Sequence, residues 1–215
     1  GNTGAQMGGW FRREINTVED LRGLKMRIPA LGGEVMDRLG VSVQVLAGGE
    51  IFPALERGAI DATEWVGPYD DEKLGFNKVA PFYYYPRWWE GGPMLHTLVN
   101  TAKWAELPKS YQSIVMAAAQ AANCDMMAKY DAVNPAALKK LAAGGAKLRP
   151  FPQDVMEAAF KAANETYDEV MATNAGFKKI YESMAAFRAD QYLWFQVSEH
   201  TYDTFMMGLQ RKKLL

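Results

Sequence analysis

The first hundred residues alternate short apolar runs with stretches of helical periodicity. The runs that read as strands are 24–28, 42–46, 61–65 and 94–100. One helix is expected near 33–39 and another between 46 and 61. Strands separated by helices in this way favour parallel βαβ units, so the pattern predicts an α/β fold.

The second half of the chain has a different pattern. From Pro108 to about Ala143, and from Gln153 to about Leu209, apolar residues recur every three or four positions, which is the period of an amphipathic helix. Asn134-Pro135 is expected to break or kink the first region, and Asn174-Ala175-Gly176 to interrupt the second. A short strand is expected at 146–149, between the two helical regions.

An aromatic segment, 81–93, separates the two halves. It has proline at both ends and a double glycine, so it reads as a loop or crossover that carries a slab of aromatic surface. Packing between lobes and a ligand wall are equally compatible with this composition.

Composition excludes several classes of function. The formal net charge of −1 leaves no electrostatic footprint for nucleic acid or anionic lipid. Cys124 is the single cysteine, so neither an intramolecular disulfide nor a thiolate metal cluster can form, and such a chain suits either the cytoplasm or the periplasm. There is no run of about 18 apolar residues that would span a membrane.

A basic residue stands at the end of the first predicted strand. Arg27 precedes Pro29, Gly32 and Gly33, which fix a turn and leave room for a ligand. Ligands bind at the carboxyl ends of strands in α/β sheets, and a guanidinium can hold a carboxylate through two parallel hydrogen bonds. A surface arginine that pairs with a nearby acid is the other interpretation.

An acidic residue stands at the end of the third predicted strand. The carboxylate of Glu64, the backbone carbonyl of Trp65 and the side-chain amide of Gln6 would together form an all-oxygen shell for a hard cation such as Na⁺ or Ca²⁺. A solvated or capping role for Glu64 remains open on spacing alone.

Two other classes of function remain open. A carboxylate-dependent hydrolase would use Glu50, Asp61 or Glu64 as an acid/base pair, although this leaves Arg27 without a role. The chain could also be a non-binding fragment whose main behaviour is self-association.

Three groups of motifs resemble a known family. They are Gly23-Leu24-Lys25-Met26-Arg27-Ile28-Pro29; Glu50 through Ala54-Leu55 with Gly58 and Asp61; and Leu98-Val99-Asn100 with Trp104 and Leu107-Pro108. This pattern is similar to the substrate-binding proteins of tripartite ATP-independent periplasmic (TRAP) transporters. The opening residues 1–11 and the pair Glu64-Trp65 resemble the branch that binds 2-oxo acids, in which a cation bridges substrate and protein.

The resemblance implies a periplasmic solute-binding protein, not an enzyme, that binds a small 2-oxo monocarboxylate such as pyruvate and delivers it to TRAP membrane subunits. It implies that Arg27 clamps the carboxylate, and that Gln6, Glu64 and the carbonyl of Trp65 hold Na⁺, with Ca²⁺ as the alternative. From the aromatic segment we expect Trp89 to shape the pocket.

The family has a periplasmic-binding-protein-like fold of two lobes joined by a hinge, with long C-terminal helices. On this basis residues 1–98 are expected to form the second lobe with the main ligand-binding motifs, and 99–215 the returning strands and long helices that pack across both lobes. The N-terminal part of the first lobe is expected to be missing. The apolar surface left exposed would then favour a homodimer.

Overall fold

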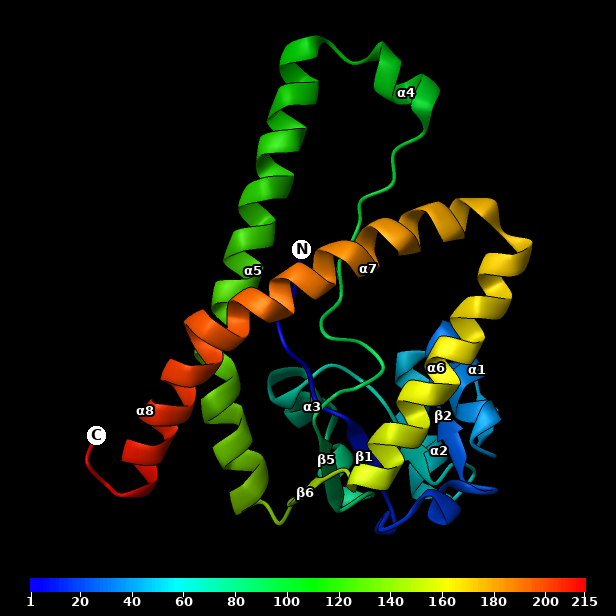
Figure 1. Ribbon diagram of the computed structural model, residues 1–215, viewed down its shortest axis with the longest axis vertical. Coiled ribbons are helices and arrows are strands. Elements are labelled where there is room, and N and C mark those ends of the chain that lie inside the picture. The colour runs from blue at the N-terminus through cyan, green and yellow to red at the C-terminus, as the bar shows by residue number, and fades with distance from the viewer. The chain divides into compact units, whose positions relative to one another are not determined.

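The computed structural model describes all residues from Gly1 to Leu215. The chain forms two compact units, Gly1–Asn164 and Glu165–Leu215, whose elements are labelled in Figure 1. Among the helices, none has both the length and the apolar composition needed to cross a membrane. The division predicted from the sequence is different, with a second lobe at 1–98 and returning strands and helices at 99–215. That division refers to the two lobes of the family and stays a prediction.

The first unit is built on one mixed sheet of six strands in the order β3-β2-β4-β1-β5-β6. The strands are β1 (Gly9–Phe11), β2 (Lys25–Arg27), β3 (Ser42–Gln44), β4 (Ala62–Thr63), β5 (Phe82–Tyr85) and β6 (Lys147–Pro150). Strand β2 pairs in parallel with both β3 and β4, as the βαβ pattern predicted. Strand β1 is antiparallel to β4 and β5, and β5 is parallel to β6. The predicted α/β class is confirmed.

Helices follow the strands and account for most of the rest of the chain. They are α1 (Ala30–Arg38), α2 (Gly48–Glu56), α3 (Pro68–Leu74), α4 (Thr101–Glu106), α5 (Lys109–Ala143), α6 (Gln153–Thr173), α7 (Ala175–Phe195) and α8 (Thr201–Arg211). Short 3₁₀ turns occupy Val18–Leu21 and Phe76–Lys78, and a π-helical turn at Gln196–His200 joins α7 to α8.

The two central strands β1 and β5 divide the core between the two faces of the sheet. Successive side chains of a strand point to opposite faces, so Trp10 and Tyr83 lie on one face and Phe11 and Tyr84 on the other. All four side chains are buried. Trp10 lies opposite Tyr83 in the register, and their rings stack at 3.9 Å between centroids.

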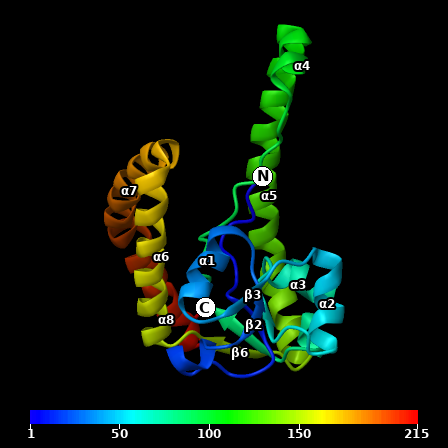
Figure 2. The ribbon, with the colours of Figure 1, turned by 90° about the vertical axis from the view of Figure 1, so that its right-hand side faces the viewer.

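Each face of the sheet is covered by helices (Figure 2). On the Phe11 face, Met36 of α1 and Val155 of α6 complete one apolar cluster. On the Trp10 face, Ile51 of α2 and Leu141 of α5 complete another. The sheet is thus buried on both sides, and its strand ends are left as the accessible edge for a ligand.

Four sequence expectations are corrected. The strand predicted at 94–100 was wrong, because this segment has no neighbouring strand to pair with and makes only the isolated bridge Asn2↔Met94. The strand predicted at 61–65 is reduced to Ala62–Thr63. The expected break at Asn134-Pro135 does not interrupt α5, where Asn134 Oδ1 accepts a hydrogen bond from the Tyr69 N–H at 3.0 Å. The aromatic segment 81–93 begins with strand β5 instead of a loop.

Strand β1 was not predicted, because a run of three residues shows no periodicity. Its first residue, Gly9, has φ +95°, and a Cβ there would lie 2.5 Å from the Thr63 carbonyl oxygen and 3.2 Å from the Glu64 Cα. Glycine therefore permits β1 to approach the end of β4 closely. This contact brings the N-terminal residues 6–9 beside Glu64.

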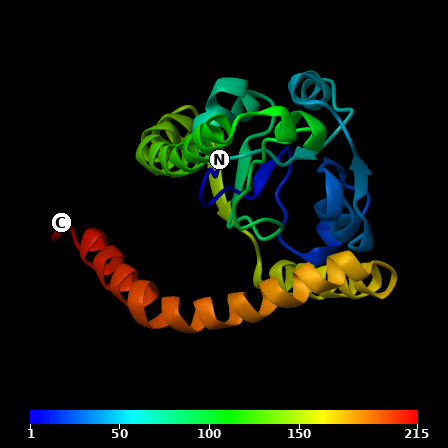
Figure 3. The same ribbon diagram turned by 90° about the horizontal axis from the view of Figure 1, so that it is seen from above.

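The second unit, Glu165–Leu215, contains the end of α6 followed by α7 and α8. Figure 3 shows α7 continuing into α8 as one bent helical rod. The rings of Tyr167 and Tyr181 pack at 4.9 Å, which links α6 to α7. The two last helices and the turn between them carry exposed large apolar side chains, namely Ile180, Met184, Phe187, Tyr192, Leu193, Trp194, Phe195, Val197, Tyr202, Phe205 and Met207.

A buried carboxyl group, Asp71, lies beneath the stacked pair on the Trp10 face. Its Oδ2 accepts hydrogen bonds from Trp10 Nε1 at 2.9 Å and from the Tyr83 hydroxyl at 2.7 Å, and its Oδ1 accepts one from the Val66 N–H at 3.3 Å. Burial raises the pKa of Asp71 from 3.8 to about 7, although the three hydrogen bonds act in the opposite direction.

This raised pKa predicts a pH-dependent loss of stability. Between about pH 4 and pH 7 the folded chain holds a proton on Asp71 that the unfolded chain has released, so unfolding becomes easier as the pH rises through this window. Relative to the Asp71→Asn variant, the wild type should lose up to about 4 kcal/mol of unfolding free energy between pH 4 and pH 7.5. Chemical denaturation followed by tryptophan fluorescence measures this difference.

Asp125→Asn, at an exposed carboxyl, provides the matched control for removing one acid. If the stability curves of the wild type and Asp71→Asn ran parallel across this pH range, the prediction would be wrong.

Candidate functional site

Arg27 and Glu64 meet at the carboxyl ends of two adjacent parallel strands. Arg27 ends β2 and lies opposite Thr63 of β4, so Glu64 follows directly beyond that pair. Arg27 Nη1 forms an ion pair with Glu64 Oε1 and donates a hydrogen bond to the Glu64 carbonyl at 3.2 Å. Arg27 Nε donates to the Leu46 carbonyl at 3.2 Å. The sequence alone placed these two groups at strand ends, and the parallel register brings them into direct contact.

A second arginine, Arg87, reaches the same carboxylate from the segment that follows β5. Its Nη2 donates to Glu64 Oε2 at 3.2 Å and pairs with Glu90, and its Nη1 donates to the Trp65 carbonyl at 2.8 Å. Sequence reasoning missed Arg87. The available signal was a charged side chain set among tryptophans, which requires a carboxylate or carbonyl partner when it is buried.

The strand order explains how this segment reaches Glu64. Only β1 separates β4 from β5, and the Gly8 N–H donates to the Tyr84 carbonyl at 2.7 Å. A Cβ on Gly8 would lie 3.1 Å from the Pro86 carbonyl oxygen. The chain after β5 therefore passes close to β1, on the way to the end of β4.

The four charged groups form a cluster whose formal charges balance, and three of the four side chains are largely buried. The side chains of Glu64 and Arg87 are each 6% exposed, that of Arg27 is 11% exposed and that of Glu90 is 38% exposed. Burial raises the pKa of Glu64, while the guanidinium groups of Arg87 and Arg27 pull it down. Burial also lowers the pKa of Arg87, against the attraction of Glu64 and Glu90. Since both arginines contact its carboxylate, Glu64 is positioned as a charged oxygen donor.

A cavity of about 220 Å³ opens beside this cluster. Its lining consists of Glu64, Arg87, Trp89 and Glu90 together with residues 28–32. The Nε–H of Arg87 and the Nε1–H of Trp89 are buried without an acceptor in the protein. The cavity therefore combines a charged wall with hydrogen-bond donors that a bound acceptor would satisfy.

The backbone of the opposite wall contains a strained residue. Ala30, at the start of α1, has φ +53°, which is uncommon for a residue with a Cβ. The glycines that follow have a packing role, because a Cβ on Gly33 would lie 3.1 Å from the Ile28 carbonyl oxygen. Backbone strain of this kind is found where a ligand site fixes the chain.

Gln6, the third predicted cation ligand, is buried. Its Nε2 donates to Thr3 Oγ1 at 2.7 Å, and its Oε1 is buried without a hydrogen-bond partner. The next residue, Met7, donates its N–H to the Val66 carbonyl at 3.1 Å, which places the Gln6 backbone alongside the segment after Trp65. An unsatisfied amide oxygen, a carboxylate and a backbone carbonyl are the donors that a hard cation takes, so these residues fit Na⁺ or Ca²⁺.

The indole of Trp65 packs away from its carbonyl. A Cβ on Gly48, at the start of α2, would lie 2.7 Å from the Trp65 ring, and the Arg27 guanidinium lies 5.2 Å from the centroid of the same ring. Trp65 therefore supports Arg27 through its side chain while it offers its carbonyl to the cluster.

The acids of the hydrolase hypothesis do not form an acid/base pair. Glu50 Oε2 accepts a hydrogen bond from the Ala47 N–H at 3.0 Å at the start of α2, and Asp61 Oδ2 accepts one from the Lys25 N–H at 3.1 Å. Both carboxylates satisfy backbone groups at the ends of elements. Glu64 is the one of the three that lines the cavity of about 220 Å³.

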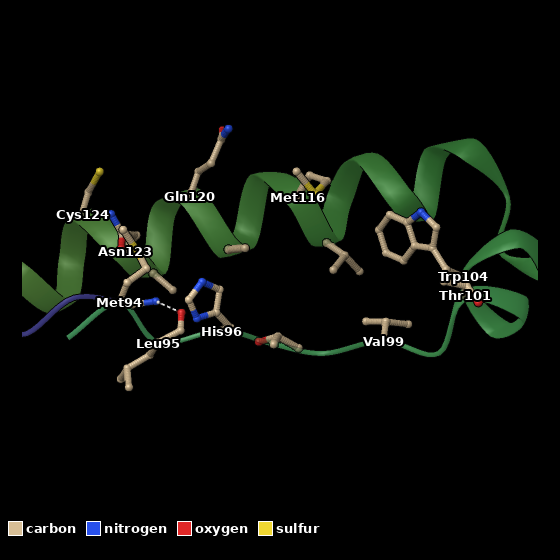
Figure 4. Close-up of a pocket in the computed structure, with 15 residues that line it drawn as sticks. Met94, Leu95, His96, Val99, Thr101, Trp104, Met116, Gln120, Asn123 and Cys124 are labelled. Atoms are coloured by element: carbon tan, nitrogen blue, oxygen red, sulfur yellow. Dashed lines mark hydrogen bonds between the residues drawn. The ribbon is translucent and has the colours of Figure 1, made fainter. Parts of the chain in front are cut away.

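A larger and more apolar hollow of about 890 Å³ lies elsewhere in the first unit (Figure 4). Residues 94–104 form one side of it and the N-terminal half of α5 forms the other, and His96 and Cys124 are among its lining residues. Apart from the amino group of Gly1, which donates to the Leu95 carbonyl at 3.1 Å, the lining carries no charged side chain. The hollow therefore has no arginine or lysine side chain in its lining.

One protein in particular is similar to this chain in sequence. A monocarboxylate 2-oxoacid-binding periplasmic protein from Nostoc sp. strain PCC 7120 is 57% identical over 210 residues, which is 98% of this chain and 58% of the relative. The chain thus spans a little over half the length of this relative.

Solved structures of TRAP solute-binding proteins share the fold. One from Bordetella bronchiseptica RB50, described as a mixed-occupancy dimer with copurified calcium and picolinate, has a TM-score of 0.96 and 48% identity over 99% of this chain and 63% of its own. One from Pseudoalteromonas atlantica T6c, with bound sodium and pyruvate, has a TM-score of 0.89 and 43% identity over 94% of this chain and 62% of its own. The fold prediction is confirmed, and these neighbours carry the two cations that the sequence predicts.

A family model also matches residues 1–174, which is most of the chain and includes every residue of the site described above. The resemblance drawn from the sequence is thereby confirmed, and the chain belongs to the DctP family, the bacterial extracellular solute-binding proteins of family 7.

Proposed function

We propose that this protein is an extracytoplasmic solute-binding protein of a TRAP transporter that binds a small 2-oxo monocarboxylate such as pyruvate. Arg27 holds the ligand carboxylate, and Gln6, Glu64 and the Trp65 carbonyl hold a cation, Na⁺ or Ca²⁺. The observation that carries the proposal is that Arg27 contacts Glu64, which lines a cavity of about 220 Å³, and that Arg87 links the same carboxylate to the Trp65 carbonyl.

The ligands of the solved neighbours support a chelating acid. Picolinate and pyruvate, bound in the structures from Bordetella and Pseudoalteromonas, each carry a carboxylate with a second electron-pair donor on the adjacent carbon. An acid of this shape can offer two donors to one cation. The Nostoc relative is also named for 2-oxo acids.

The size of the cavity favours a small ligand. Its volume of about 220 Å³ is below the ~300 Å³ at which the range for drug-sized ligands begins. The cavity wall contains Trp89, the aromatic residue that we expected to shape the pocket, together with Glu64 and Arg87. A short acid with an apolar methyl end matches a lining that contains both charged side chains and an aromatic one.

Arg27 is held ready for a carboxylate. Its Nε and Nη1 donate to the Leu46 carbonyl and to Glu64, while Nη2 takes no part in these contacts and stays available for a ligand oxygen. Because these contacts fix the guanidinium plane before binding, less side-chain entropy is lost when the ligand arrives. A cation at Glu64 would supply positive charge for the 2-oxo oxygen and a carboxylate oxygen.

The proposed partners follow from the family. A TRAP solute-binding protein delivers its ligand to membrane subunits from the periplasm, and we extend both the location and the partner to this chain. We also propose a homodimer, supported by the exposed apolar side chains of α7 and α8 and by the dimer described for the Bordetella structure.

Replacement of the clamp should remove ligand binding. Arg27→Gln leaves the ligand carboxylate without a charged partner, so pyruvate should lose about 2–5 kcal/mol of binding free energy. Calorimetry with pyruvate in the presence of Ca²⁺ measures the change. Arg22→Gln, at an exposed arginine that pairs with Glu19 on the surface, is the matched control and should bind as the wild type does. Equal affinity in both variants would contradict the proposed clamp.

Ligand binding should depend on a cation. In sodium-free buffer with a calcium chelator, the affinity for pyruvate should fall at least tenfold (about 1.4 kcal/mol), and added Na⁺ or Ca²⁺ should restore it. Glu64→Gln should weaken binding in the same way and should gain little from added Ca²⁺, because it lacks the charged donor. Unchanged affinity in the chelated sample would show that the cation has no part in binding.

The association state is predicted to be dimeric. Light scattering of the purified protein at micromolar concentration should give twice the mass of the chain, because burial of the apolar side chains of α7 and α8 stabilises a pair. A monomer mass at this concentration would exclude the proposed dimer.

A further inference from the structure

Arg87 contacts two of the three oxygen donors in the proposed cation site. Its Nη2 donates to Glu64 Oε2 at 3.2 Å and its Nη1 donates to the Trp65 carbonyl at 2.8 Å. These are the same groups that the proposed function gives to Na⁺ or Ca²⁺. One guanidinium thus covers both a carboxylate oxygen and a carbonyl oxygen that a cation would need.

We propose that Arg87 is an internal substitute for the cation, and that the metal must displace its guanidinium from Glu64 and the Trp65 carbonyl in order to bind. This inference rests on the proposed function and concerns how the same site is regulated. A cation seated on both oxygens would lie at about 2.3–2.6 Å from each. At such distances it would be only a few ångström from the guanidinium, and two like charges in a buried site repel strongly.

The charges of the cluster support this exchange. The two positive charges of Arg27 and Arg87 cancel the two negative charges of Glu64 and Glu90, so the cluster has no net formal charge. A cation added alone would leave an excess of positive charge at a site that is largely closed to water. A cation that arrives together with a ligand carboxylate adds much less charge, so the arrangement favours joint binding of metal and acid.

The hydrogen bonding of Arg87 is incomplete where it lies on Glu64. Its Nε–H is buried without an acceptor, so the guanidinium lacks one hydrogen bond where it lies. Glu90 already pairs with Arg87 Nη2 and is the most exposed acid of the cluster. When Arg87 leaves Glu64 it can keep Glu90 as its partner, so its charge need not be left alone.

Calcium binding without any 2-oxo acid tests the proposal. Arg87→Met removes the competing charge at similar side-chain volume, so calorimetry with CaCl₂ alone should show at least tenfold higher Ca²⁺ affinity than the wild type. Arg149→Met is the matched control, because Arg149, on strand β6, lies outside the cluster and pairs with Glu14 at 2.7 Å. It should bind Ca²⁺ as the wild type does. Equal or lower Ca²⁺ affinity in Arg87→Met would overturn the proposal.

A double-mutant cycle separates the role of Glu90 from a direct effect on the metal. In the otherwise wild-type protein, Glu90→Gln should lower Ca²⁺ affinity at least threefold, because Arg87 then has no carboxylate to pair with when it leaves Glu64. It should have a smaller effect when combined with Arg87→Met. The same loss in both backgrounds would mean that Glu90 acts on the cation directly, and would overturn the exchange.

Two further measurements keep the outcomes distinct. If Arg87→Met does not fold, Arg87→Lys replaces it, since one ammonium group is a poorer match for two separated oxygens, and its Ca²⁺ affinity should rise at least threefold; no rise would count against the proposal. If the wild type binds pyruvate with Ca²⁺ but Arg87→Met gains nothing, only the role of Arg87 fails. If neither protein binds Ca²⁺ or pyruvate, the proposed function fails and the exchange fails with it.

Discussion

The contact between Glu64 and its two arginines is the interaction on which the site depends. A buried carboxylate is costly unless charged donors surround it, and Arg27 and Arg87 supply them, one to each carboxylate oxygen. Arg27 comes from the adjacent parallel strand, while Arg87 comes from beyond β5. The sheet therefore has to hold β2, β4, β1 and β5 in this order for the three side chains to meet.

The core of the first unit supports this order through its aromatic residues. Trp10 and Tyr83 stack on one face of the sheet, while Phe11 and Tyr84 pack edge to face on the other. Each pair joins β1 to β5, so the antiparallel register between these strands is fixed on both faces. The site thus inherits its geometry from a core that lies directly beneath it. A change in that register would move Arg87 away from Glu64.

Membership of the solute-binding family and the local chemistry both support the proposed binding of a small acid with a cation. The chain belongs to a family of extracellular solute-binding proteins, and the oxygen donors of the proposed site fit a hard cation. The formal charges of Arg27, Arg87, Glu64 and Glu90 cancel. A metal ion bound alone would therefore add net positive charge, and this favours its binding together with an acid. Under the proposed exchange, Arg87 contributes to the free energy of cation binding, although it was not among the predicted ligands.

The sequence by itself determined the βαβ order, the helical second half and the position of Arg27 and Glu64 at strand ends. These features depend on local periodicity and on residues close together in the chain, which a pattern can report. Tertiary structure alone decided the antiparallel insertion of β1, the lack of a partner for 94–100 and the approach of Arg87 to Glu64. Each of these features depends on contacts between segments that are far apart in the chain. Neither a strand of three residues nor an arginine in an aromatic segment carries a local sequence pattern that predicts its partner.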